Sequence, residues 1–457
     1  MLGFDEDLIV AQCTPQGKGA LALLRITGTN ARQCVDSFAL LASGKKIKDV
    51  SSHTIHFGRI IDESGTVLDQ VMFLVMDGPK TFTGQDTIEI TCHNNPFLIE
   101  ALIEQAIKKG VRLAQEGEFT KRAFLQKKID LIQAEAIQEL ISAHTQMALK
   151  KSLAQLEGSF SHWIDALEKD LLKGIAWCEV SFEFLDEGVE FGADIRISLE
   201  NILTKIAHLK EVFDAQQQIK HGIKIALIGS VNAGKSSLFN ALLKQRRAIV
   251  TDIPGTTRDV IEAGLYQKGN YWTLVDTAGL RQTKDTIEQE GIKRSFEEAH
   301  KADVILLVFD GSRALTHHEE EIYQDIFKNY EKKIIFVQSK QDLATWEHHP
   351  FHTYCPLRVS ITQKHTLEDL TEKIDAKISV LFTTLESPFL LNKRHYALLL
   401  TLEQKMLTLL GLLIEPIHYE IVSYHLHDAL TTLSELTGKS IHEAALDLIF
   451  KEFCVGK

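Results

Sequence analysis

Cysteine and proline are scarce in this chain of 457 residues. Its six cysteines are widely scattered and form no C-x-x-C pair, which argues against a disulfide framework and against a cysteine-rich zinc site. With only eight prolines and no low-complexity tract, the chain has few candidates for disordered linkers. At 457 residues the chain should hold two to four domains. Its scattered cysteines fit a reducing compartment.

Long apolar runs and excess positive charge are also missing. No apolar run is long enough to cross a bilayer, and the acidic N-terminal segment Met1–Asp7 lacks the basic region of a secretory signal. These features predict a cytoplasmic protein without a membrane span. The formal net charge of −12 supplies no overall field that attracts nucleic acid, so any RNA substrate must use a local basic patch or a partner protein.

A phosphate-binding motif lies in the middle of the chain. Residues Gly229–Ser236 fit the pattern G-x-x-x-x-G-K-[ST], with the apolar run Ile223–Ile228 before them and the run Ser237–Leu243 after them. The first run predicts a buried parallel strand and the second a helix, which is the context this motif requires. Its glycines let backbone N–H groups close around phosphate oxygens at a helix N-terminus. Lys235 would reach the outer phosphates, and the Ser236 hydroxyl would bind Mg²⁺.

Two further segments are suited to hold magnesium and to sense the γ-phosphate. The segment Thr251–Arg258 lies where a switch loop places a hydroxyl on the metal; we prefer Thr257 for this role, with Thr256 as the competitor. A predicted strand ends in Asp276–Gly279. Asp276 suits a second metal anchor, and the N–H of the glycine can contact the γ-phosphate.

A third segment predicts guanine as the base. The expected strand Lys333–Val337 is followed by Gln-Ser-Lys-Gln-Asp, which resembles the N-K-x-D signature. Asp342 would accept hydrogen bonds from the ring N–H and amino groups of guanine, which adenine does not offer in that arrangement. Ser339 stands where asparagine is usual, which weakens one supporting contact, and Val359–Ser360 is the expected last base-contacting loop. Together the segments favour a guanine-nucleotide switch over an ATPase.

The means of hydrolysis is open at this point. Ras-like enzymes orient the attacking water with a glutamine just after the D-x-x-G segment, but here Leu280 follows Gly279. Another group must therefore position the water and balance the transition-state charge. The candidates are Arg281, Glu288, Glu290 and a monovalent cation held by Asn232 of the phosphate loop.

Hydrophobic patterning divides the chain into domains. Residues 1–118 predict a mixed α/β (α+β) domain, and residues 119–220 and 383–457 predict helices. Strand and helix alternate over residues 221–382, which is the doubly wound pattern. We therefore expect one helical domain with an α/β domain inserted into it; two separate helical domains are the alternative.

Several elements are specific enough to be compared with a structure. In the first domain the pattern predicts strands at 8–11, 20–26, 53–61, 70–76 and 87–91, and helices at 28–41 and 97–109. The seam of a helical bundle or coiled coil is expected at Leu199, Ile202, Ile206, Leu209 and Phe213.

Two motifs do not indicate sites. Thr437–Ser440 resembles the end of a second phosphate loop, but the upstream glycine and a preceding strand are missing, so it predicts a turn that caps a helix. The pairs His317-His318 and His348-His349 have no cysteine or carboxylate at metal-ligand spacing, and adjacent side chains point apart. We expect these to be exposed loop histidines.

Motifs of one family recur over the whole chain. They lie at residues 7–12, 24–28, 81–86, 117–125, 130–136, 232–237, 255–259 and 276–281, and at the terminal Phe453–Lys457. The terminal F-C-[IV]-G-K is the most specific, because other switch GTPases share the middle motifs but not the ends. On these motifs the chain resembles the bacterial and organellar tRNA-modification GTPase family MnmE, also called TrmE.

The resemblance implies an architecture and a reaction. It implies an N-terminal domain that mediates homodimerisation and binds 5,10-methylenetetrahydrofolate or a 5-formyl-tetrahydrofolate-like folate, a helical bundle domain, and an inserted Ras-like P-loop G domain. GTP, Mg²⁺ and K⁺ would be the other cofactors, with hydrolysis stimulated when two G domains pair. In a heterotetramer with an FAD-dependent MnmG-like protein, the chain would help to add an aminomethyl or carboxymethylaminomethyl group to carbon 5 of the wobble uridine of certain tRNAs.

The resemblance also assigns roles to residues. Glu288 and Lys235 match catalytic positions, and Ser236 and Thr257 match Mg²⁺ ligands. The K⁺ site would comprise Asn232, Thr251, Ile253 and Thr256. The folate site would comprise Arg25, Glu89, Lys128 and Lys457; without the resemblance these read as edge-of-strand charges (the first two) and surface charges (the last two). The expected GTP-binding set is completed by Ala233, Gly234, Ser237, Asp252, Pro254, Gly255, Asp276, Thr277, Ala278, Gly279, Lys340, Asp342 and Ser360.

The chain departs from the family pattern in places. Asn94-Asn95 replaces glycines after His93, Gln85 replaces an acidic residue, Ser230-Val231 replaces Arg-Pro, and Pro254 lies in the potassium loop. None of these changes removes a predicted ligand. For Cys454 we favour a structural or binding role over that of a nucleophile, because only Lys457 is a basic neighbour that would lower the thiol pKa.

Two other functions are alternatives. One is a ribosome-assembly or regulatory switch GTPase, which would need an RNA-binding appendage, usually a basic one. The other is a folate enzyme regulated by GTP, which leaves tRNA unexplained.

Overall fold

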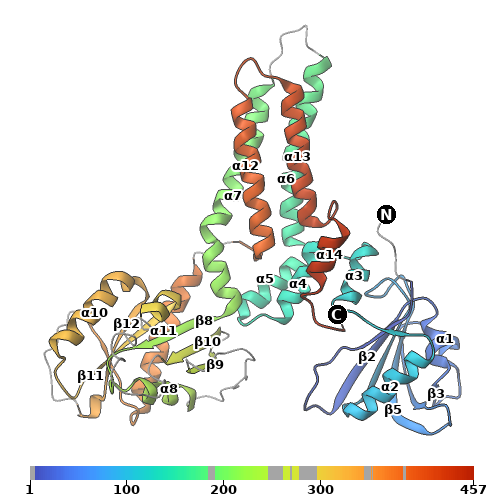
Figure 1. Cartoon of the computed structure of the whole chain (residues 1–457), viewed down its shortest axis with the longest axis horizontal. Helices are drawn as coiled ribbons and strands as arrows, with labels where there is room; N and C mark the ends of the chain where they lie inside the picture. The colour runs from blue at the N-terminus through green and yellow to red at the C-terminus, as the bar shows by residue number, and fades with distance from the viewer. Residues whose placement is uncertain are drawn as a thin grey trace. The chain divides into compact units, whose positions relative to one another are not determined.

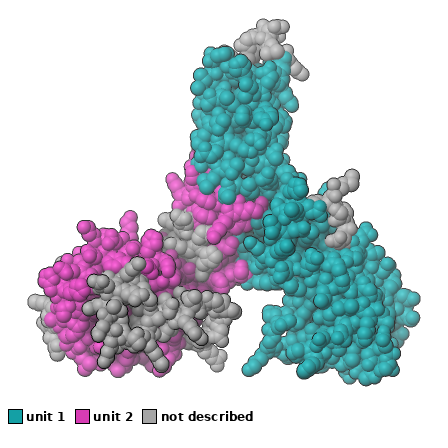
Figure 2. All heavy atoms as spheres, viewed as in Figure 1, with its two compact units in different colours: residues 1–141, 154–203, 397–457 teal, residues 142–153, 204–396 magenta. Residues whose placement is uncertain are grey.

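The computed structural model describes residues 6–183, 191–244, 261–267, 270–276, 296–343, 351, 354–383 and 387–456. Figure 2 shows two compact units, each assembled from segments that are far apart in the sequence. One comprises residues 1–141, 154–203 and 397–457, and the other comprises residues 142–153 and 204–396. The domain boundaries at 118, 220 and 382 stay predictions.

The first unit contains a seven-stranded sheet in the order β3-β4-β5-β6-β2-β1-β7. All neighbours are antiparallel except β1 and β7, which are parallel. One face of the sheet packs against helices α1 (Ala31–Asp36) and α2 (Pro96–Lys108) in a single apolar core. The strands are β1 (Ile9–Gln12), β2 (Leu21–Thr27), β3 (Ala39–Leu41), β4 (Thr54–Ile61), β5 (Val67–Met76), β6 (Thr87–His93) and β7 (Arg112–Leu113).

The predicted strands of this domain are confirmed to within a few residues, but one predicted helix is wrong. The expected helix over residues 28–41 is a short helix, α1, followed by strand β3. Helix α1 ends at Asp36, and β3 then pairs with β4, with Leu40 opposite Arg59. Pairing with a distant strand therefore decides the conformation of this segment, over a stretch too short to carry a periodic signal.

The helical part of the first unit combines helices from residues 154–203 with helices from residues 397–457. Helix α6 (Ser159–Glu183) lies beside α13 (Tyr419–Thr437) (Figure 1). The buried apolar residues of α13 recur at steps of 4, 3, 4 and 3, as in a coiled-coil seam: Val422, Leu426, Ala429, Leu433 and Leu436. The unit's other helices and part-helices are α3 (Glu118–Leu125), α4 (Leu131–Ile141), α14 (Glu443–Phe450), and portions of α5 (Gln146–Leu156), α7 (Gly192–His221) and α12 (Lys393–Leu412).

The predicted seam on α7 is confirmed by burial. Leu199, Ile202, Ile206 and Leu209 are all buried. Phe213, the last predicted member, stacks on Tyr396 with 3.7 Å between ring centroids. Among the described residues, no helix is both long and apolar enough to span a bilayer.

The second unit contains a six-stranded sheet in the order β13-β12-β11-β8-β10-β9, parallel except for the β9–β10 pair. Helices α8 (Lys235–Lys244) and α11 (Lys364–Thr383) contribute to the core on one face, and α10 (His317–Tyr330) to the core on the other. This is the predicted doubly wound fold. Its strands are β8 (Ile223–Ile228), β9 (Ile261–Gln267), β10 (Asn270–Asp276), β11 (Val304–Asp310), β12 (Ile334–Ser339) and β13 (Leu357–Arg358).

The second phosphate-loop look-alike is confirmed as a helix cap. Gly438 follows α13 with φ of 83°, and the N–H groups of Gly438 and Lys439 donate to carbonyls of the last turn. His317 and His318 are exposed, as expected, but they begin helix α10 rather than lie in a loop. His348-His349 lies outside the described residues, and the described residues contain no group of three His, Cys, Asp or Glu side chains suited to a metal.

Candidate nucleotide site

The phosphate loop connects β8 to α8 at the carboxyl end of the central strand of the second sheet. Two of its residues have left-handed backbones, Asn232 with φ of 63° and Gly234 with φ of 92°. Gly229 packs so closely against β11 that an added Cβ would lie 2.0 Å from the Val308 carbonyl oxygen. The loop therefore requires glycine at 229 for space and favours glycine or asparagine at the two left-handed positions.

Lys235 is the buried cation of this loop. Only 5% of the residue is exposed, and its Nζ donates to the carbonyl oxygens of Gly229 and Ser230, each at 2.7 Å. Burial lowers the lysine pKa, and the nearby charge of Asp276 acts in the opposite direction. A phosphate group bound in the loop would supply the negative charge that favours the protonated amine.

The second expected metal anchor lies on the neighbouring strand. Asp276 ends β10, pairs with Leu227 of β8 and is buried. Because β8 and β10 are parallel, their carboxyl ends lie at the same edge of the sheet, where the phosphate loop begins. Ser236, Ser237 and Asn232 expose their side chains at this loop, while Ala233 is buried.

The predicted guanine-reading segment is held by side chains of its own. Lys340 has φ of 56°, and its Nζ donates to Oδ2 of Asp310 at 2.6 Å. Burial opposes ionisation of Asp310, but hydrogen bonds from Lys340 and Ser312 outweigh it and lower the pKa of this carboxyl. The segment's Asp342 accepts a hydrogen bond from the Ser360 hydroxyl at 2.7 Å.

Ser360 therefore supports the guanine-reading carboxylate. Its N–H donates to Oγ1 of Thr366 at 3.0 Å, while its hydroxyl donates to Asp342. Both donors of Ser360 are thus used within the protein. If this loop contacts the base as predicted, the contact must use atoms other than the Ser360 N–H and hydroxyl.

Sequence reasoning missed the support beneath the phosphate loop. The hydroxyl of Tyr323, on α10, accepts from the Ser230 N–H at 2.7 Å and donates to the Val308 carbonyl at 3.0 Å. The start of α10 is fixed by a capping box in which Thr316 and Glu319 exchange side-chain and backbone hydrogen bonds. The T-x-x-E spacing of that box was a signal in the sequence, but nothing local linked Tyr323 to the loop.

Several predicted site residues lie outside the described residues. They are Thr251, Asp252, Ile253, Pro254, Gly255, Thr256, Thr257, Thr277, Ala278, Gly279, Glu288 and Lys457. The alternative catalytic candidates Arg281 and Glu290, and Leu280, also lie there. Their assignments stay predictions.

The structure brings two of the predicted folate residues together. Arg25 of β2 and Glu89 of β6 are opposite each other in register and form an ion pair at 2.7 Å. The guanidinium of Arg25 also lies 5.4 Å from the ring centroid of Phe119, on α3. Both residues lie mid-strand in inner strands, so their interpretation as edge-of-strand charges is wrong. Lys128 is exposed just beyond α3.

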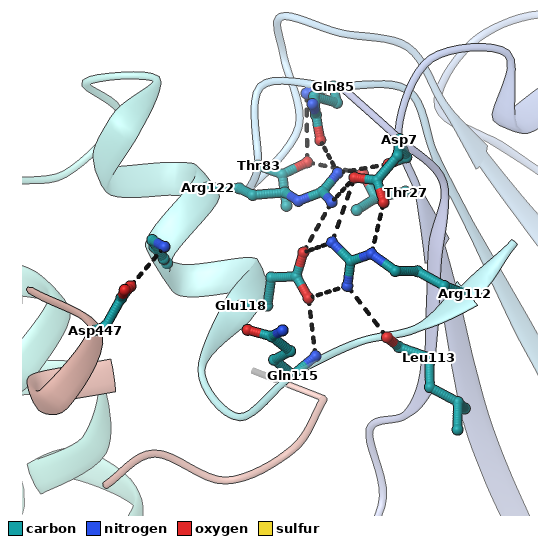
Figure 3. Close-up of polar contacts among 11 residues, drawn as sticks. Asp7, Thr27, Thr83, Gln85, Arg112, Leu113, Gln115, Glu118, Arg122 and Asp447 are labelled. Carbon is teal, nitrogen blue, oxygen red and sulfur yellow. Dashed lines mark hydrogen bonds and ion pairs between the residues drawn. The ribbon is translucent and has the colours of Figure 1, made fainter. Parts of the chain in front are cut away.

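A charged network that sequence reasoning missed holds α3 to the sheet (Figure 3). Glu118 accepts hydrogen bonds from Arg112 at 2.6 and 2.7 Å and from Arg122 at 2.8 Å. Asp7 binds the same two arginines, and Arg122 also donates to Oε1 of Gln85 at 3.0 Å. Burial opposes ionisation of Glu118, but the hydrogen bonds from the arginines and a backbone N–H lower its pKa. Glu118 and Arg122 have the i, i+4 spacing of a helical ion pair, but Asp7 and Arg112 are 105 positions apart, so no local pattern predicts the whole network.

The C-terminal tail reaches the same part of the first unit. Val455 forms an antiparallel bridge with Glu116, and the Gly117 N–H donates to the Cys454 carbonyl at 3.4 Å. Cys454 itself is exposed. The tail therefore ends beside the domain in which Lys457 was predicted to contribute to a folate site.

Comparisons with known proteins cover nearly the whole chain. The family model described as "MnmE helical domain" matches residues 131–454, and that described as "GTP-binding protein TrmE N-terminus" matches residues 8–128. Curated relatives named "tRNA modification GTPase MnmE" are 34% identical in Fervidobacterium nodosum, 36% in Alkaliphilus metalliredigens and 37% in Flavobacterium psychrophilum. Each alignment covers 99% of this chain and 98%, 100% and 99% of the respective relative.

Solved GTPase domains match about a third of the chain. The G domain of the T. maritima FeoB iron transporter aligns with 34% of this chain and 98% of that domain, at 28% identity and a TM-score of 0.27. The doubly wound fold rests on the strand order and on the phosphate loop between β8 and α8.

Proposed function

The chain belongs to the MnmE (TrmE) family of tRNA-modification GTPases, and from this premise we propose a potassium-dependent GTPase that modifies carbon 5 of the wobble uridine in certain tRNAs. It is a GTP-hydrolysing enzyme that acts in tRNA modification. The group added would be aminomethyl or carboxymethylaminomethyl, installed together with an FAD-dependent MnmG-like partner in a heterotetramer. Because the protein acts in tRNA modification, we propose that it is located in the cytoplasm.

One observation carries the GTPase part of the proposal. A buried lysine, Lys235, lies inside a phosphate loop between β8 and α8, and a buried carboxylate, Asp276, ends the adjacent parallel strand. A cation and a metal-binding carboxylate at one sheet edge are what a bound triphosphate with Mg²⁺ requires. Lys235 would hold the outer phosphates, and Glu288 would position the attacking water.

The donor set fits the two proposed metal ions. Mg²⁺ and K⁺ are hard cations that prefer oxygen ligands, and both Ser236 and Asn232 present oxygen-bearing side chains at the exposed surface of the loop. Ser236 and Thr257 would hold Mg²⁺, while Asn232, Thr251, Ile253 and Thr256 would hold K⁺. When bound, these ions would supply the positive charge that the transition state requires.

Two features of the N-terminal sheet support the proposed folate and dimer roles. Arg25, Glu89, Lys128 and Lys457 would bind the glutamate carboxylates and the polar pterin of the folate. The face of the sheet opposite α1 and α2 exposes large apolar side chains, including Leu40, Ile55, Phe57 and Met72, at 53, 62, 48 and 41%. Strand register places Phe57 opposite Met72. An apolar sheet face of this kind is typical of a subunit interface, which supports homodimerisation.

Mass spectrometry of wobble uridines tests the tRNA part of the proposal. A strain that lacks the gene should lose the modification at carbon 5, and a plasmid copy should restore it. Unaltered wobble uridines in the deletion strain would contradict the proposal and favour the alternative of a ribosome-assembly or regulatory GTPase.

GTP turnover in K⁺ and in Na⁺ buffer tests the cation. We expect faster turnover in K⁺ and loss of this difference in Asn232→Gly. Glycine tolerates the φ of 63° at this position, so the substitution removes the ligand without backbone strain. Equal rates of the unaltered chain in the two salts would remove Asn232 from its proposed role.

A further inference from the structure

Ser339 stands at the junction of the guanine-reading segment and the phosphate loop. It is the last residue of β12 and is 7% exposed. Its Oγ lies 2.5 Å from the Ala233 carbonyl oxygen and 3.1 Å from that of Phe309. An added Cβ on Gly234 would lie 3.3 Å from this hydroxyl oxygen. Ser339 is therefore packed directly against the phosphate loop.

The number of donor protons limits what this residue can do. A serine hydroxyl has one proton, and the two nearest acceptors here are both backbone carbonyls of the protein. The shorter contact assigns the proton to Ala233. An asparagine at this position would carry two amide protons, so that one could bind the loop and the other a nucleotide.

The acceptors of the guanine base make this difference measurable. N7 and O6 on one edge of guanine are both acceptors, so a side chain can recognise them only by donating. Asp342 accepts, and it therefore reads the opposite edge, which carries the ring N–H and the amino group. Ser360 has spent both of its donors within the protein.

We propose that Ser339 ties the guanine-reading segment to the phosphate loop and gives no hydrogen bond to the N7 edge of the base. The inference rests on the proposed GTP binding and concerns how this chain recognises guanine. Ser339 then positions the phosphate loop. Specificity for guanine comes from the ring N–H and amino group that Asp342 binds.

The test compares GDP with 7-deaza-GDP, which lacks the N7 acceptor. Dissociation constants of both are measured on the full-length chain by isothermal titration calorimetry in Mg²⁺ and K⁺. The unaltered chain should bind the two nucleotides equally. Ser339→Asn should bind GDP more tightly and should prefer it to 7-deaza-GDP by about three- to tenfold, the effect of one added hydrogen bond.

Ser339→Ala separates the tie from base recognition. Removing the hydroxyl should weaken binding of both nucleotides by the same factor, about fivefold for one lost hydrogen bond, and leave their ratio at one. Ser339→Thr keeps the hydroxyl and serves as the control.

Three outcomes would overturn the inference. They are a preference for GDP of threefold or more in the unaltered chain, an unchanged ratio in Ser339→Asn, and unchanged affinity in Ser339→Ala. The first needs no variant, so misfolding cannot obscure it. Failure of the unaltered chain to bind GDP at all would instead contradict the proposed GTPase function.

Discussion

At the residue scale, the asparagines that replace glycines after His93 have structural roles. Oδ1 of Asn95 accepts hydrogen bonds from the N–H groups of Phe97 and Leu98, at 3.0 and 3.4 Å, and so caps helix α2. The amide of Asn94 donates to the Gly17 carbonyl at 2.9 Å. The departure from the family pattern therefore adds a helix cap and a loop contact rather than disturbing the backbone.

Asn95→Ala should weaken the first turn of α2 by about 1 kcal/mol, because two helical N–H groups lose their acceptor. Amide hydrogen exchange of the peptide that contains Phe97 and Leu98 should accelerate accordingly. Asn95→Gly is the matched control, since glycine at an N-cap costs only a few tenths of a kcal/mol. Equal exchange in the alanine variant and the unaltered chain would show that the cap is not stabilising.

At the element scale, helix α10 supports the phosphate loop from below. The capping box fixes its first turn, and Tyr323 in its second turn bonds the Ser230 N–H. Two hydrogen bonds from Arg313 lower the pKa of Glu319 in that box from 4.5 to about 2. Ionised Glu319 is therefore favoured by the fold, and its protonation weakens the start of α10.

The stability that Glu319 contributes should depend on pH in a defined window. A carboxyl with a depressed folded-state pKa stabilises the fold above its unfolded pKa, near 4.5, and loses that contribution as the pH falls toward 2. Glu319→Gln should therefore lower the urea midpoint of unfolding at pH 7, and the gap to the unaltered chain should narrow below pH 4.5. The exposed Glu321 of the same helix, changed to glutamine, is the control. A gap that stays constant down to pH 3 would contradict this role.

The charged network around Glu118 should be the least tolerant of substitution in the first unit. Glu118→Gln removes the charge that offsets the buried Arg122, and breaking one side of a buried pair costs about 3 kcal/mol. Urea unfolding of the full chain measures the loss. In the control, Glu63→Gln removes an exposed partner of Lys109 at 3.8 Å and should change stability by less than about 0.5 kcal/mol. Similar losses in both variants would argue against a special role for the network.

The sequence predicts well those features whose residues are close together in the chain. It misses contacts between residues that only the fold brings together. The phosphate loop, β8 and α8 are consecutive, so pattern and glycine positions sufficed to place Lys235. The support from Tyr323 and the tie from Ser339 join residues 93 and 106 positions apart. Strand β3 was missed for the same reason, since its pairing with β4 outweighs the helical pattern of the preceding residues.

At the scale of the whole molecule, segments near the two ends of the chain pack against each other in the first unit. Strand β1 lies near the N-terminus, and the C-terminal tail passes it: an added Cβ on Gly456 would lie 2.5 Å from the Gln12 carbonyl oxygen. Gly456 also has φ of 91°, which other residues rarely adopt. The tail can therefore dock on the N-terminal domain only with glycine at this position.

Gly456→Ala should detach the tail from the first unit. The added methyl group would clash with Gln12 and strain the backbone, at a cost of about 1–3 kcal/mol, which exceeds the net contribution of a single bridging hydrogen bond. Amide exchange at Gly117 should then accelerate, because the Cys454 carbonyl that accepts from its N–H leaves with the tail. GTP hydrolysis by the full-length variant should be unaffected, because the phosphate loop lies in the second unit.

Gly411→Ala is the matched control for this substitution. Gly411 lies in helix α12 with no atom within 4 Å of an added Cβ, so alanine there should leave the tail docked and stabilise the helix by about 0.5–1 kcal/mol. Unchanged exchange at Gly117 in Gly456→Ala would mean that the bridge does not depend on this glycine. Faster exchange confined to that variant would establish that one glycine joins the C-terminus to the N-terminal domain, and loss of wobble-uridine modification with GTP turnover retained would connect this contact to the reaction on tRNA.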